Sequence, residues 1–116
     1  MSVRIYHNPR CSKSRASLQL LNDKGIEPEI VLYLDVPPSI EELKDVVAKL
    51  GLGAGALIRY NEDLAKELGI AKSDQRSEHE WLALMNENPV LIERPIIVSG
   101  NKAVIGRPPE NINDIV

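Results

Sequence analysis

The chain has 116 residues, of which 43% are hydrophobic and 27% are charged, and its net charge at pH 7 is −3. These values are typical of a folded globular protein and argue against disorder. The length predicts a single domain covering residues 1–116. An acidic chain lacks the basic face that nucleic-acid-binding proteins present, so we expect no nucleic-acid partner.

The cysteine count and the N-terminal residues restrict the class of protein further. One cysteine excludes an internal disulfide and a structural zinc site built on several thiols, and we expect no metal site. The N-terminus enters an apolar strand pattern directly, without the basic segment and long apolar run of a signal peptide. No apolar stretch approaches the roughly 20 residues that cross a bilayer. We therefore expect a cytoplasmic protein, without a membrane partner, whose thiol stays free.

The first third of the sequence predicts a strand, a helix and a second strand. The first strand covers residues 3–6, and Pro9 then predicts a turn. Apolar residues at helical spacing predict a helix over residues 12–24, which ends at a glycine. The second strand covers residues 29–34. Cys11 therefore falls at the start of the first helix.

The middle of the chain, about residues 39 to 88, is predicted to be helical. Helices are expected to start at Ser39, Asn61 and Ser77. The first and third starts fit the capping box, in which a serine and a glutamate three residues later satisfy each other's backbone N–H groups. The glycine-rich run at residues 51–56 lacks the Lys-Ser/Thr ending of a phosphate-binding loop, so we interpret it as a mobile connection.

The last third predicts a hairpin followed by a helix. Residues 95–99 and 102–105 form the two hairpin strands, and the prolines at 108 and 109 can start a last helix that buries Ile112 and Ile115. A β-α-β start with a later β-β-α is the thioredoxin pattern. We expect an α/β fold with a mixed four-stranded sheet, flanking helices and a helical insertion at about residues 39–88.

Most of the chemistry lies in residues 7–15, around Cys11. The thiolate is the reactive form of cysteine, and the free N–H groups and dipole of a helix N-terminus favour negative charge. Nearby Arg10, Lys13 and Arg15 would favour the thiolate further. The same N–H groups could hold an oxyanion beside the sulfur. The sequence therefore predicts a nucleophilic thiol.

Several alternatives stay open at this point. Cys11 could be a buried, inert core residue, as free cysteines often are. His7 could tune the thiol, or it could be a strand-end histidine satisfied by the backbone. Position 14 holds Ser14, so the motif cannot be a two-cysteine redox centre. Any disulfide step must use a thiol from another molecule.

Three arginines, Arg59, Arg94 and Arg107, are candidates for binding an oxyanion. Arg94 and Arg107 each precede a proline, which holds the residue before it in extended geometry. The Arg94-Pro95 bond is also a candidate cis peptide. Arginine offers paired planar donors that suit arsenate or phosphate oxygens. The alternative for each arginine is a solvated surface charge.

The chain resembles the glutaredoxin-coupled arsenate reductases of the thioredoxin superfamily. The resemblance covers nearly the whole chain and rests on four motifs, His7-Asn8-Pro9-x-Cys11, Leu57-Ile58-Arg59-x-Asn61, Arg94-Pro95-Ile96 and Gly106-Arg107-Pro108. The fuller runs at residues 7–15 and 106–110 are similar to a shorter bacterial branch, the YfgD-like, arsenate-reductase-like proteins.

The resemblance implies a thiol oxidoreductase of arsenic detoxification that reduces arsenate to arsenite. Cys11 would attack arsenate, glutathione would serve as co-substrate, and glutaredoxin would resolve the adduct. No cofactor would be bound, and we expect a monomer. The implied oxyanion ligands are Arg59, Arg94 and Arg107.

The resemblance also assigns supporting roles around the thiol. His7 would act with Cys11 by setting its ionisation, and Pro95 would be the cis-proline beside the active cysteine. Asn8, Ser14 and Arg15 would support the loop. Two alternative functions remain, a related thiol oxidoreductase with another substrate and a non-enzymatic regulator of the same fold.

Overall fold

The computed structural model describes residues 2–116, and the chain divides into two compact units. The first, here called the sheet unit, comprises Met1–Val36 and Arg94–Val116. The second, the helical unit, comprises Pro37–Glu93 and so includes the predicted insertion with slightly wider bounds. Among the described residues, every helix is too short or too polar to cross a membrane.

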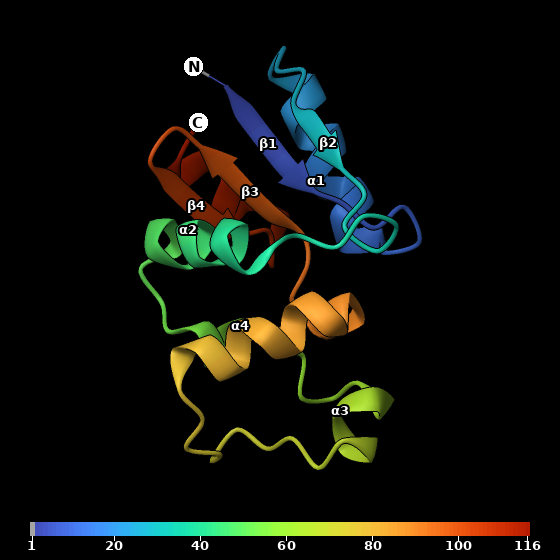
Figure 1. The fold of residues 1–116 in the computed structure, drawn as a ribbon. Coiled ribbons are helices and arrows are strands. Elements are labelled where there is room, and N and C mark those ends of the chain that lie inside the picture. The colour runs from blue at the N-terminus through green and yellow to red at the C-terminus, as the bar shows by residue number, and fades with distance from the viewer. Residues whose placement is uncertain (1) are drawn as a thin grey trace. The chain divides into compact units, whose positions relative to one another are not determined.

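The sheet unit contains the predicted mixed four-stranded sheet (Figure 1). Its strands are β1 (Val3–Tyr6), β2 (Glu29–Val31), β3 (Ile96–Ser99) and β4 (Lys102–Ile105), in the spatial order β2-β1-β3-β4. β1 pairs parallel with β2 and antiparallel with β3, and β3 pairs antiparallel with β4. Helix α1 (Ser12–Asp23) makes the crossover that a parallel pair requires.

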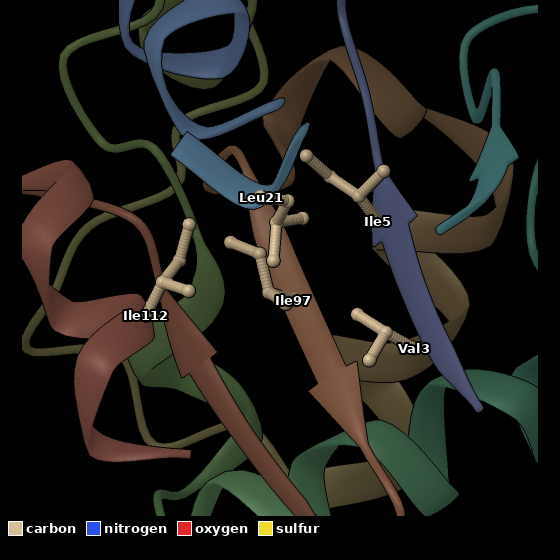
Figure 2. Close-up of a cluster of buried hydrophobic side chains, with 5 residues drawn as sticks. All are labelled: Val3, Ile5, Leu21, Ile97 and Ile112. Atoms are coloured by element: carbon tan, nitrogen blue, oxygen red, sulfur yellow. The ribbon is translucent and has the colours of Figure 1, made fainter. Parts of the chain in front are cut away.

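One face of this sheet carries the core of the unit (Figure 2). Val3 and Ile5 alternate along β1 and so point to the same side, where Ile97 of β3 lies opposite Ile5. Leu21 of α1 and Ile112 near the C-terminus cover them. All but Val3 are fully buried, so this cluster holds α1, and with it the position of Cys11, against the sheet.

Two elements of the sheet unit differ from the sequence prediction. β2 ends at Val31 and not at residue 34, because the chain turns there and the N–H groups of Asp35 and Val36 donate to the Leu32 carbonyl. The predicted C-terminal helix is a 3-10 helix, Pro109–Asp114.

The helical unit contains α2 (Ile40–Leu50), α3 (Asp63–Glu67) and α4 (Glu78–Glu87). The capping box at Ser77 is complete, and the Ser39 hydroxyl accepts from the N–H of Glu42. The glycine-rich run is more structured than a plain connection, because it contains a 3-10 helix, Ala54–Leu57, whose first residue is buried.

Candidate active site

Cys11 is the N-cap residue of α1, as predicted. Its backbone is extended, with φ −95° and ψ 123°, and its carbonyl accepts the first helical hydrogen bond from the Arg15 N–H at 3.0 Å. The Cys11 N–H in turn donates to the Asn8 carbonyl, which closes a tight turn before the helix. The side chain of an N-cap residue faces the free N–H groups of the first turn. The sequence therefore places the sulfur where negative charge is favoured.

Opposing effects set the ionisation of the thiol. Burial raises the pKa of Cys11, whose exposed fraction is only 8%. The backbone N–H groups of Ser14 and Lys13 and the positive charges of Arg94 and Arg107 lower it, and together they outweigh burial. The pKa of the Cys11 thiol therefore lies below its ordinary value. Burial alone would suit an inert core cysteine, but the lowered pKa favours the reactive alternative.

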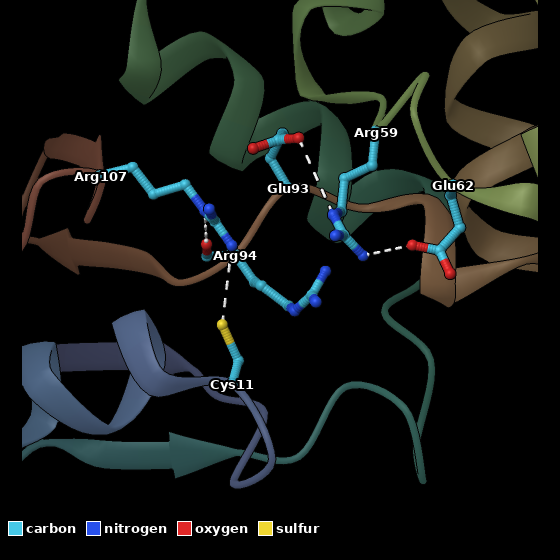
Figure 3. Close-up of polar contacts among 6 residues, drawn as sticks. All are labelled: Cys11, Arg59, Glu62, Glu93, Arg94 and Arg107. Carbon is cyan, nitrogen blue, oxygen red and sulfur yellow. Dashed lines mark hydrogen bonds and ion pairs between the residues drawn. The ribbon is translucent and has the colours of Figure 1, made fainter.

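Two of the three predicted arginines lie beside the sulfur (Figure 3). The Nη2 atom of Arg107 is 3.6 Å from the Cys11 Sγ, and the Arg107 Nε donates to the Arg94 carbonyl at 2.7 Å. The Arg94-Pro95 bond is cis as predicted, and the Arg107-Pro108 bond, which was not predicted to be cis, is cis as well. The Arg94 Nε is buried and has no hydrogen-bond partner among residues 2–116. A buried guanidinium N–H without a partner, beside the Cys11 sulfur, is suited to an anionic ligand.

Gly106 fixes the backbone that carries Arg107. Its N–H donates to the Pro95 carbonyl at 2.8 Å. A Cβ at this position would lie 2.5 Å from the Ser17 hydroxyl of α1 and 2.8 Å from the Pro95 Cγ. Only glycine allows so close an approach, which brings Arg107 to the start of the helix that bears Cys11.

His7 contacts Ser14 and not the sulfur. The His7 Nδ1 and the Ser14 Oγ are 2.6 Å apart in a buried position, and the Asn8 N–H donates to the same hydroxyl at 3.0 Å. Burial and the charge of Arg15 hold the pKa of His7 below its ordinary value. Arg15 also donates to the Pro9 carbonyl. These contacts brace the loop before Cys11 and join His7 to Ser14, whose N–H lowers the thiol pKa. The role of His7 in setting the ionisation of Cys11 stays a prediction.

Arg59 belongs to the helical unit, where two carboxylates hold it (Figure 3). Its guanidinium is 2.5 Å from the Glu62 carboxylate and 4.0 Å from that of Glu93. The Arg59 N–H donates to the Leu91 carbonyl and the Glu93 N–H donates to the Leu57 carbonyl, so Arg59 and Glu93 lie diagonally across this short pairing. The role of Arg59 in oxyanion binding stays a prediction.

The two carboxylates beside Arg59, those of Glu62 and Glu93, were not predicted from the sequence. Glu62 follows Arg59 by three residues, a spacing at which oppositely charged side chains often meet, so this contact had a signal. Glu93 had none, because its contact with Arg59 depends on the bridge between Ile58 and Ile92.

The sheet and the N-cap cysteine define a thioredoxin-like α/β protein whose thiol has a lowered pKa. Comparison with known families identifies it further, because the model of the ArsC family matches residues 6–115 and the chain therefore belongs to the ArsC family.

Similar proteins agree with this assignment. The chain is 52% identical to the uncharacterized protein YfgD of Escherichia coli (strain K12), over 98% of this chain and 96% of that protein. It is 47% identical to an arsenate reductase of Neisseria meningitidis serogroup A, over 98% and 97% of the two chains. The solved structure of an arsenate reductase from Vibrio cholerae superposes with a TM-score of 0.94 at 49% identity, covering 100% of this chain and 98% of that one.

Proposed function

We propose that the protein is a glutathione- and glutaredoxin-dependent arsenate reductase in which the Cys11 thiolate is the nucleophile. The observation that carries the proposal is the position of the Cys11 sulfur, at the N-terminus of α1 and 3.6 Å from the Arg107 guanidinium. The names of the similar proteins from Neisseria meningitidis and Vibrio cholerae support arsenate as the substrate.

The reaction begins with substitution at arsenic. The Cys11 thiolate attacks arsenate, an S–As bond forms and one As–O bond breaks, and the oxygen leaves as water after proton uptake. Arg94 and Arg107 bind the oxyanion through charge-assisted hydrogen bonds, which are stronger than neutral ones. The free N–H groups of the first helical turn stabilise the same charge. We assign Arg59 as a third oxyanion ligand because it lies in the motif Leu57-Ile58-Arg59-x-Asn61.

The later steps need thiols from other molecules, because the chain has one cysteine. Glutathione replaces a second oxygen on arsenic, which leaves as water. The glutaredoxin thiolate then attacks the glutathione sulfur. A disulfide forms, and the electron pair of the broken As–S bond reduces As(V) to As(III). Water finally releases arsenite and restores the Cys11 thiolate.

The test is reduction of arsenate with glutathione, glutaredoxin, glutathione reductase and NADPH, in which each turnover consumes one NADPH. Wild type is expected to turn over only when both thiol partners are present, and Cys11→Ser is expected to be inactive. Ser12→Ala, which removes the neighbouring hydroxyl, is the matched control and should keep activity. If arsenite does not form with a folded wild-type protein, the proposal fails, and the alternatives of a different oxidised substrate or a non-enzymatic role take its place.

A further inference from the structure

A pocket of the sheet unit adjoins the loop that leads into Cys11. It has a volume of about 340 Å³, with residues 7–10 on one side and Leu32, Leu34 and Asp35 on the other. This volume is at the small end of ligand pockets, which suits a ligand of a few residues and not a large cofactor. The mechanism described above uses Cys11, which follows residues 7–10 in the chain, and none of the residues that line the pocket.

The walls of the pocket carry groups of both charges and an apolar surface. Arg10 and Asp35 are exposed, and their side chains make no hydrogen bond or ion pair with other residues in the described part of the chain. Leu32 and Leu34 are each 40% exposed and give the pocket wall an apolar surface.

The edge strand of the sheet leads directly into this pocket, because β2 ends at Val31 and Leu32 lines the pocket. β2 is an edge strand, and the Val31 carbonyl accepts from the His7 N–H, so residue 31 faces β1. Because backbone groups alternate along a strand, those of Ile30 face away from the sheet, whereas the Leu32 carbonyl beyond the strand accepts from the N–H groups of Asp35 and Val36. An extended peptide can bind such an edge through its own backbone.

The two opposite charges, the apolar wall and the neighbouring strand edge match a short peptide with a free carboxylate and a free ammonium. Glutathione is such a peptide, with two carboxylates, one ammonium and two peptide bonds. The proposed function requires it to meet arsenic on Cys11, and residues 7–10 connect the pocket directly to that residue.

We propose that the pocket between residues 7–10 and residues 32–35 binds glutathione, with Arg10 pairing with a carboxylate and Asp35 with the ammonium. The inference rests on the proposed function for its reaction step. There, the bound thiol forms an As–S bond, an As–O bond breaks, and the displaced oxygen takes the thiol proton and a second proton and leaves as water.

Binding can be tested without arsenate, so its failure and the failure of the proposed function are distinguishable. The probe is S-methylglutathione, which binds as glutathione does but cannot react, titrated into ¹⁵N-labelled protein while amide shifts are followed by NMR. We expect saturable shifts concentrated at residues 7–10 and 30–35. Arg10→Ala and Asp35→Ala are each expected to weaken binding about twofold to fivefold, the range for exposed charge pairs.

The matched control is Lys24→Ala, which removes a cation at the other end of α1 and should leave binding unchanged. Steady-state kinetics give a second readout, since Arg10→Ala should raise the KM for glutathione and not that for arsenate. Shifts confined to other residues, or binding that the two variants leave intact, would overturn the inference. So would variants that raise only the KM for glutaredoxin, because the pocket would then bind the protein partner.

Discussion

Replacing Gly106 with alanine tests how the backbone before Arg107 is held. The new Cβ would lie 2.5 Å from the Ser17 Oγ, 2.8 Å from the Pro95 Cγ and 3.1 Å from the Ile97 Cδ1. Optimal carbon contacts are about 3.5–4.0 Å, so two of these atoms would have to move by roughly 1 Å. Overpacking of a core costs about 1–3 kcal/mol, and with two such contacts we expect the upper part of that range, about 2–3 kcal/mol.

Thermal unfolding followed by circular dichroism measures this loss. At roughly 3–6 °C per kcal/mol for a chain of this size, Gly106→Ala should melt roughly 6–18 °C below wild type. Gly53→Ala is the control, because its φ is −71° and a Cβ there would have no neighbour within 4 Å, so its melting temperature should not fall.

A double variant identifies the cause of the loss. The Ser17 hydroxyl is buried and has no hydrogen-bond partner among residues 2–116, so Ser17→Ala alone should be close to neutral. Combined with Gly106→Ala it removes the closest contact and should recover part of the stability. The reasoning is refuted if Gly106→Ala melts with wild type, or if the double variant is no more stable than Gly106→Ala.

Three further predictions concern the thiol and the core. Arg107→Ala removes a positive charge that lowers the pKa of Cys11, so the rate at which Cys11 is alkylated should reach its plateau only at a higher pH. The same variant loses a hydrogen bond to a charged group, worth about 1.5–3 kcal/mol, and should lower kcat/KM for arsenate about 10- to 150-fold. The pKa of Cys11 is lower in the folded than in the unfolded protein, so the thiolate stabilises the fold at pH values above the unfolded pKa. This stabilisation is lost as the pH falls through the folded pKa. Urea unfolding of wild type and Cys11→Ser should therefore show a difference in the free energy of unfolding that shrinks as the pH is lowered. Leu21→Ala should destabilise the sheet unit by about 2–5 kcal/mol in the same urea assay, because Leu21 is fully buried in the core cluster.

Local signals made most of the fold predictable. The helix that starts after Cys11 and the capping box at Ser77 depend on residues within one helical turn, and both are confirmed. The end of β2 was predicted three residues too late, because the apolar residues 32 to 34 continue a strand pattern while the backbone turns back onto Leu32. An apolar pattern does not show where a chain stops pairing.

The site was predictable in its residues but only partly in its contacts. The position of Cys11 followed from the helix start, whereas the neighbourhood of Arg94 and Arg107 depends on β3 and β4 pairing beside β1, more than 80 residues away in the sequence. Sequence position suggested that Arg10 and Arg15 would act on the thiol. In the structure Arg15 instead holds the Pro9 carbonyl and lowers the pKa of His7.

The decisive property is the pKa of the Cys11 thiol, which the start of α1 and the charges of Arg94 and Arg107 lower below its ordinary value. Thiolate absorbance measured against pH tests it most directly, because the chain has one cysteine and the signal belongs to Cys11 alone. Cys11→Ser gives the baseline. The account predicts a midpoint below the ordinary thiol value of about 8.5, and a higher midpoint when Arg94 and Arg107 are both replaced by alanine. A wild-type midpoint at or above that ordinary value would contradict it.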